Sequence, residues 1–116
     1  MANASSKSLV WLHGEVRTPP PSTPARLETG VLLRRLQRGD LLGLPHSRPM
    51  PAIGKRCHEL RIIDKAATWR LIYRIDGDAI VIVEVFGKKT QTTPKSVIGV
   101  CKRRLLKYAA IVGEKE

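Results

Sequence analysis

A chain of 116 residues has room for one domain. Its apolar fraction of 42% and charged fraction of 27% are typical of a globular protein and exclude a disordered one. The 21 Lys and Arg against 10 Asp and Glu leave a net charge of +11, which favours a polyanionic partner such as nucleic acid, an anionic membrane surface or an acidic protein. The longest uncharged apolar run, at 79–83, is too short to span a bilayer, and segment 1–7 lacks the apolar core of a signal peptide. We therefore expect a cytoplasmic protein with no membrane partner.

The domain is expected to span residues 8–112, between flexible tails at 1–7 and 113–116. Within it, the short apolar run at 8–12 predicts an edge strand. The proline-rich segment at 18–24 predicts a loop, because proline removes a backbone donor and restricts the preceding residue.

A helix is predicted to begin at Thr23, because threonine is a good N-cap and Pro24 suits the first turn. Gly39 is a typical stop signal for its end. The following segment, 44–54, contains three prolines and is predicted to be a loop. The apolar stripe of the helix is expected to comprise Leu27, Val31, Leu32, Leu33 and Leu36.

Three strands are predicted at 58–62, 69–75 and 79–86. The turn residues at 76–78 favour an antiparallel pairing of the last two. The third strand is apolar on both sides except for Glu84, as is typical of a central strand. Alternation separates an apolar face from a face that carries Arg61, Arg70 and Arg74.

A second helix is predicted after Thr93 and Pro94, with apolar residues at spacings of three and four that share one face. The predicted fold class is α+β: a small antiparallel β-sheet with helices packed on its one apolar face. The arginine face of the sheet is expected to stay partly open.

Five basic residues are expected at or around that open face: Arg61, Arg70, Arg74, Lys88 and Lys89. Guanidinium groups that converge on one spot can hold a phosphodiester and stabilise the charge of its transition state. The alternative interpretation is a solvated basic face with no specific ligand.

His58, next to Glu59, is a candidate general acid or base, and the alternative is a partly buried strand histidine. The scattered histidines and carboxylates predict no metal site, and no phosphate-binding loop motif or other cofactor signature occurs. Cys57 and Cys101 are expected to be reduced, partly buried thiols, and a disulfide between them is the alternative.

Several motifs, in this order, resemble those of a known family. They are Leu32–Gln37, Pro45–Pro51, Cys57–Ile62, Trp69–Ile75, and Phe86–Gln91 with Thr93 and Pro94. Together they are similar to the phage-derived branch of HigB-like toxins, within the RelE/ParE superfamily of type II toxin–antitoxin systems. The resemblance covers roughly residues 9–108, and several motifs in the right order are more specific than any one of them.

The resemblance implies a RelE-like fold, a twisted antiparallel sheet flanked by helices. It implies metal-independent cleavage of mRNA in the ribosomal A site, in which a ribose 2′-hydroxyl attacks the neighbouring phosphate and basic side chains replace the usual histidine pair. The implied partners are the ribosome, mRNA and a cognate helix-turn-helix antitoxin.

By motif, Arg70 matches an arginine that touches the scissile phosphate, and Arg61 matches a lysine position. Lys88 and Lys89 match a basic pair whose second member would stabilise the leaving group. Lys95 stands near the place of a RelE tyrosine, so the stacking role is unassigned. We expect additional RNA contacts from Arg74, Lys95 and Arg104.

Two other hypotheses remain open. ParE relatives share this scaffold and inhibit gyrase without enzymatic activity. The chain could also be an inactive module that only binds an acidic antitoxin. Convergence of Arg61, Arg70 and Lys89 favours the nuclease, because a gyrase inhibitor has no need for phosphate ligands on the sheet.

Overall fold

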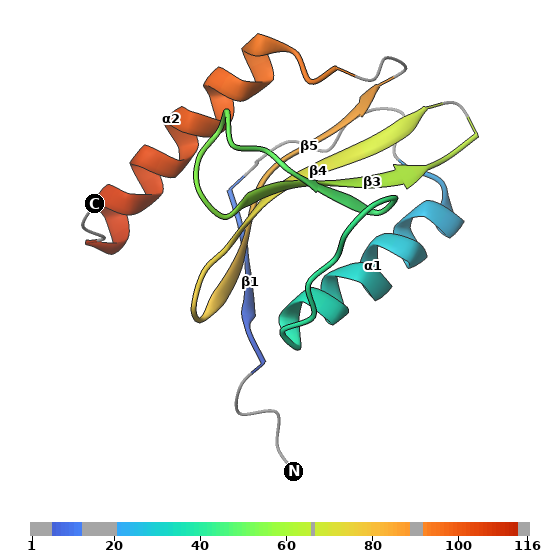
Figure 1. The fold of residues 1–116 in the computed structure, drawn as a ribbon, viewed down its shortest axis with the longest axis horizontal. Helices are drawn as coiled ribbons and strands as arrows, with labels where there is room; N and C mark the ends of the chain where they lie inside the picture. Colours follow the sequence, from blue (N-terminus) through green and yellow to red (C-terminus); the bar gives the residue numbers. More distant parts are fainter. Residues whose placement is uncertain (1–5, 13–20, 66, 89–91, 114–116) are drawn as a thin grey trace.

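The described part of the chain forms a five-stranded sheet that lies between two helices (Figure 1). The computed structural model describes residues 6–12, 21–65, 67–88 and 92–113. The expected tails therefore lie mostly outside the described residues. The elements in chain order are β1 (Ser8–Trp11), α1 (Thr23–Gln37), β2 (Ser47–Pro49), β3 (Cys57–Ile63), β4 (Thr68–Ile75), β5 (Ala79–Lys88) and α2 (Lys95–Val112).

The strand order is β1-β5-β4-β3-β2, and the α+β class is confirmed. The predicted hairpin is present, since β4 and β5 pair antiparallel across the turn at 76–78. The sheet is mixed rather than wholly antiparallel, because β1 pairs in parallel with β5 at one edge. At the other edge, β2 pairs antiparallel with β3 in a segment for which prolines predicted only a loop. Its Pro49 is tolerated because an edge strand can spare a backbone donor.

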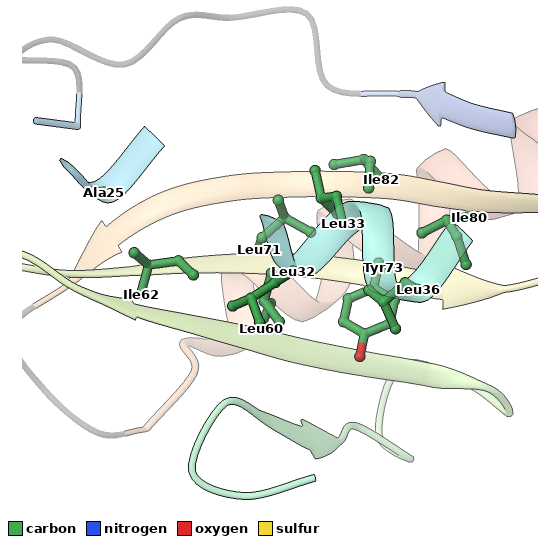
Figure 2. Packing of buried hydrophobic residues seen from close by; sticks show 10 residues of the cluster. All are labelled: Ala25, Leu32, Leu33, Leu36, Leu60, Ile62, Leu71, Tyr73, Ile80 and Ile82. Atoms are coloured by element: carbon green, nitrogen blue, oxygen red, sulfur yellow. The ribbon is translucent and has the colours of Figure 1, made fainter. Parts of the chain in front are cut away.

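The two helices cover opposite faces of the sheet, whereas the sequence placed both on one face (Figure 1). Helix α1 packs against Leu60, Leu71 and Tyr73, which Figure 2 shows together beneath it. Helix α2 packs through Cys101 and Leu105 against the other face. The physical reason lies in β4 and β5, whose second face is also apolar and has to be buried. That second core contains Ile72, Val81, Val83 and Phe86.

An irregularity in β5 changes which of its side chains face α2. The pairing of β4 with β5 shifts between Ile72 and Tyr73, so that Val83 has no direct partner on β4. Such a β-bulge interrupts the alternation of side chains. Val83 and Phe86 consequently lie in the same core, although strict alternation placed Phe86 on the face opposite Val83.

The N-cap of α1 lies one residue earlier than predicted, and the helix itself begins at Thr23. Ser22 is the N-cap, and its hydroxyl accepts a hydrogen bond from the backbone of Ala25. The buried stripe also differs, because Leu27 and Val31 are 67% and 49% exposed. The helix turns its other side to the sheet, and its buried residues are Ala25, Leu32, Leu33 and Leu36.

Asp64, between β3 and β4, ties this cap to the sheet. Its carboxylate accepts hydrogen bonds from the backbone and hydroxyl of Ser22 and from the indole of Trp69. The bonds from Ser22, followed by that from the backbone of Lys65, lower the pKa of Asp64 from 3.8 to about 2. Because these bonds favour the ionised form, the carboxylate stabilises the fold.

We expect Asp64→Asn to lower the thermal midpoint at pH 7, by an amount that shrinks as the solution is acidified. A depressed folded-state pKa contributes stability above the unfolded value near 3.8, and this is lost as the pH falls through about 2. Thermal melts of both proteins between pH 2 and 7 measure the difference. A difference that stays constant below pH 4 would contradict the assignment, and Asp78→Asn, at an exposed turn, is the control.

Lys7, which the sequence placed in the tail, is bound to the folded domain. Its backbone N–H donates to Gln37, and its ammonium donates to the carbonyl oxygens of Asp76 and Gly77. These bonds join the start of the chain to the end of α1 and to the β4–β5 turn. None of the helices within the described ranges is long and apolar enough to cross a membrane.

Both cysteines are free, and both are buried rather than partly buried as the sequence predicted. Their reduced state stays a prediction. Burial raises the pKa of the Cys57 thiol. Burial, together with the Glu84 carboxylate, raises the pKa of Cys101 to about 12. Alkylation requires the thiolate.

We therefore expect both thiols to resist iodoacetamide at pH 8 in the native protein and to react within minutes in denaturant. Mass spectrometry of timed samples distinguishes the two states. Rapid native labelling of Cys101 would show that α2 opens far more often than its packing implies.

Candidate functional site

Arg61 of β3 and Arg70 of β4 lie directly opposite each other across the sheet. Their side chains share one face, as the alternation predicted, but α2 covers this face. The expected openness of this face is wrong for Arg70, which is 2% exposed, while Arg61 is half-buried. The difference arises because α2 packs on this face and Thr93, just before it, contacts Glu59.

Glu59 is the centre of a buried polar cluster on the same face. One carboxylate oxygen accepts hydrogen bonds from Arg70 Nη1 at 2.6 Å and Arg48 Nε at 3.0 Å. The other accepts from the Thr93 hydroxyl at 2.6 Å. Glu59 is completely buried, although the sequence placed it on a polar face. We refer to Arg48, Glu59, Arg70 and Thr93 as the Glu59 cluster.

The corner of the sheet around this cluster is electropositive. Two guanidinium groups face one carboxylate within the cluster, and Arg61 adds a third cation beside them. Lys95 is exposed at the first position of α2, where no side chain caps the helix and the positive end of the helix dipole lies. An anion that approaches this corner therefore meets several donors and little opposing charge.

Two guanidinium-bearing side chains of the corner, those of Arg48 and Arg61, are partly exposed. The Arg48 side chain is 35% exposed. Arg61 is half-buried, and its Nε is a buried donor without a hydrogen-bond partner among the described residues. A buried donor that lacks a partner costs free energy, and a phosphate oxygen is a suitable acceptor for it.

The basic pair at the end of β5 is only partly described. The backbone of Lys88 pairs with Thr68, two positions beyond the pair formed by Phe86 and Arg70. This places the end of β5 beside the start of β4, near Arg70. Lys89 lies outside the described residues.

His58 is not brought together with Glu59 or the arginines. Its ring stacks on Tyr73 with centroids 5.4 Å apart, on the α1 side of the sheet, and its Nδ1 lies 3.1 Å from the Arg56 carbonyl oxygen. Neighbouring residues of a strand point to opposite faces, so the two candidate acid–base residues cannot act as a pair. This arrangement matches the alternative reading of His58 as a strand histidine.

Arg74 and Arg104, the other predicted RNA contacts, are engaged within the fold. Arg74 is 7% exposed, and its guanidinium donates to both Asp76 carboxylate oxygens, at 2.8 and 2.9 Å. Arg104 donates to the carbonyl oxygen of bulged Val83 at 2.8 Å and to Glu84 at 3.2 Å. Of the three residues predicted as RNA contacts, Lys95 alone lies at the corner.

Arg48 and Thr93 belong to the site, but no pattern in the sequence predicts them as site residues. Arg48 belongs to a three-residue strand in a segment for which the prolines predict a loop. Thr93 fits a helix start, and nothing in its local sequence indicates a contact with Glu59. The pairing of Arg48 with Glu59 across β2 and β3 is the missing signal. An isolated glutamate in an apolar strand points to buried basic partners, because a charge in a core needs compensation.

A sheet flanked by helices, with a cationic corner on one face, fits a toxin-like protein of the RelE/HigB type. The model of the family described as phage derived protein Gp49-like (DUF891) matches residues 21–106, about three quarters of the chain. The chain belongs to this family, which is toxin-like and of RelE/HigB type. The comparison with curated proteins finds no match.

Proposed function

We propose that the protein is the toxin of a type II toxin–antitoxin system, of the HigB-like branch, and that it cleaves mRNA on the ribosome without a metal ion. The observation that carries the proposal is the Glu59 cluster, in which the Arg48 side chain is 35% exposed, together with the half-buried Arg61 beside it. The proposed partners are the ribosome, mRNA and a helix-turn-helix antitoxin.

In the proposed reaction, Arg61 and Arg48 hold the scissile phosphate. The ribose 2′-oxygen loses its proton and attacks the adjacent phosphorus, while the bond to the 5′-oxygen breaks and that oxygen takes up a proton. The products are a 2′,3′-cyclic phosphate and a 5′-hydroxyl. Guanidinium groups stabilise the negative charge that develops on the phosphate oxygens.

Arg70 is proposed as a positioning residue rather than a phosphate ligand. Its guanidinium is almost completely buried and bonded to Glu59, which in turn orients Arg48 from the opposite side. The same carboxylate accepts bonds on both oxygens, so it is better suited to fixing arginines than to accepting a proton. The proposed candidates for the proton transfers are Lys88 and Lys89, which by resemblance match a basic pair at the leaving group, and Lys95, which is exposed at the start of α2.

Purified protein added to programmed, translating ribosomes tests the proposal. We expect cleavage of the mRNA within the A-site codon, with cyclic-phosphate and 5′-hydroxyl ends, and no cleavage of the same mRNA without ribosomes. In cells, incorporation of labelled amino acids should fall before DNA synthesis does. If DNA synthesis stops first while mRNA stays intact, inhibition of gyrase replaces the proposed function.

A further inference from the structure

A second open surface lies between the loop at 53–57 and the C-terminal half of α2. It is a groove of about 770 Å³. Its floor is apolar and includes the buried side chains of Ile53, Leu105 and Ala109. Its rim carries three exposed cations: Lys55, Arg56 and Lys102.

No residue of the Glu59 cluster lines this groove, although Cys57, which does, lies only two positions from Glu59 along β3, about 7 Å at the rise of a strand. Cys57 and Arg74, which line it, pair with each other four positions along the strands from the pair of Arg61 and Arg70. At about 3.3 Å per residue, that separation is roughly 13 Å. Helix α2 connects the two surfaces, because it begins beside Thr93 and its residues 102–109 form one wall of the groove.

No carboxylate lines the groove within the described residues. The nearby Asp76 carboxylate accepts hydrogen bonds from Nε and Nη2 of Arg74, and its Oδ1 lies 3.5 Å from Arg56 Nη1. Lys55 and Lys102 form no ion pair with any described part of the chain. The rim therefore offers positive charge that the protein itself does not neutralise.

The loop that forms the other wall is held in place. Arg56 has a φ of 64°, a left-handed conformation that a non-glycine residue adopts at some cost. Its carbonyl oxygen accepts a hydrogen bond from the backbone of Ile75 at 3.0 Å, which ties the loop to the end of β4. A wall that is already ordered loses little entropy when a ligand binds.

The apolar surface of the groove continues along α2. Leu106 lines the groove and is 65% exposed, and Val112, 52% exposed, follows Leu105 and Ala109 at helical spacing. A small anion would leave this stripe uncovered, and the phosphates of a nucleic acid offer it no apolar surface. A helix of a partner protein with an apolar stripe flanked by carboxylates could cover the apolar surface of α2 and pair with the cations of the rim.

We propose that this groove is a docking site for an acidic amphipathic helix of a partner protein. The apolar side chains of that helix would contact Ile53, Leu105 and Leu106, and its carboxylates would pair with Lys55 and Lys102. The inference goes beyond mRNA cleavage, since it assigns a surface on which no reacting residue lies.

Selection from a displayed library of random 20-residue peptides against the full chain tests the inference. We expect enrichment of peptides with apolar residues at spacings of three and four and flanking Asp or Glu. Lys102→Glu and Leu106→Glu should each weaken the enriched peptides by about tenfold or more, measured by fluorescence anisotropy. Lys107→Glu, on the same helix but outside the groove, and Leu41→Glu, at a position 81% exposed, should change affinity less than about twofold.

Several outcomes would overturn the inference. One is enrichment of peptides without this pattern, and another is equal binding by the groove variants and their controls. Displacement of the peptide by an RNA oligonucleotide whose own binding depends on Leu106 would make the groove a nucleic-acid site. Self-association that Leu106→Glu abolishes, measured by sedimentation, would make it a dimer interface. Because the assay measures binding alone, it is independent of whether the protein cleaves mRNA.

Discussion

Replacing Glu59 with methionine should lower the free energy of unfolding by about 3–5 kcal/mol, a fall in the thermal midpoint of roughly 10–25 °C. Glu59 is completely buried, and Arg70 is 2% exposed. The substitution removes the carboxylate to which Arg70, Arg48 and Thr93 donate, and leaves the charge of Arg70 inside the fold. Breaking a buried ion pair costs more than the pair contributes, because the remaining charge loses its compensation.

The double variant Glu59→Met with Arg70→Met provides the matched comparison. With both charges replaced by apolar side chains of similar length, most of the lost stability should return. Glu28→Met, an exposed glutamate on α1, should leave the midpoint nearly unchanged. Denaturant melts of the unmodified protein, Glu59→Met, Arg70→Met and the double variant give the coupling between the two sites. A double variant as unstable as the sum of the single variants would show that the two charges do not interact.

Truncation of Arg61 to alanine should reduce ribosome-dependent cleavage about 100-fold or more while the fold stays intact. Arg61 is half-buried at the electropositive corner, and it makes no ion pair with any described residue. Its removal therefore subtracts charge from the proposed phosphate site without leaving a buried carboxylate behind. Cleavage rates on programmed ribosomes, read beside thermal melts, separate the two effects.

Arg103→Ala, at an exposed position on α2, removes the same charge from another surface and should cleave at close to the unmodified rate. Arg70→Ala is unsuited to this purpose, because its loss should impair stability as well as cleavage. Full activity in a folded Arg61→Ala protein would remove Arg61 from the proposed reaction.

The sequence predicted well which residues share a face, and poorly which face is covered. A period of two follows from strand geometry, so Arg61 and Arg70 were correctly placed on the same side. Whether that side meets a helix depends on residues far away in the chain. The arginines favoured the prediction that this face is exposed to solvent. The neighbouring Ile72, Val81 and Val83, however, are apolar and require a helix on that side.

The candidate site was less predictable than the fold, because its partners come from distant segments. Arg48 and Thr93 are 11 and 34 residues from Glu59 along the chain, and no local pattern connects them. The bulge at Val83 is equally hidden, since one extra residue in β5 becomes visible only in its pairing with β4. The alternation of side chains along β3 places His58 on the face opposite Glu59 and the arginines, as observed. The adjacency of His58 and Glu59 in the sequence nevertheless suggested a shared site.

The bonds from Lys7 to the β4–β5 turn have a consequence for the order in which a newly made chain folds. Lys7 and Asp76 are 69 residues apart, so β1 cannot pair with β5 until the intervening chain has been synthesised. At roughly 5–20 residues per second, the wait is about 3–14 s. The Glu59 cluster needs Thr93 as well, which emerges from the ribosome later still. A nascent chain thus lacks its complete arginine corner until most of its length has been translated. During those seconds, a partner could bind the nascent chain before the corner is complete.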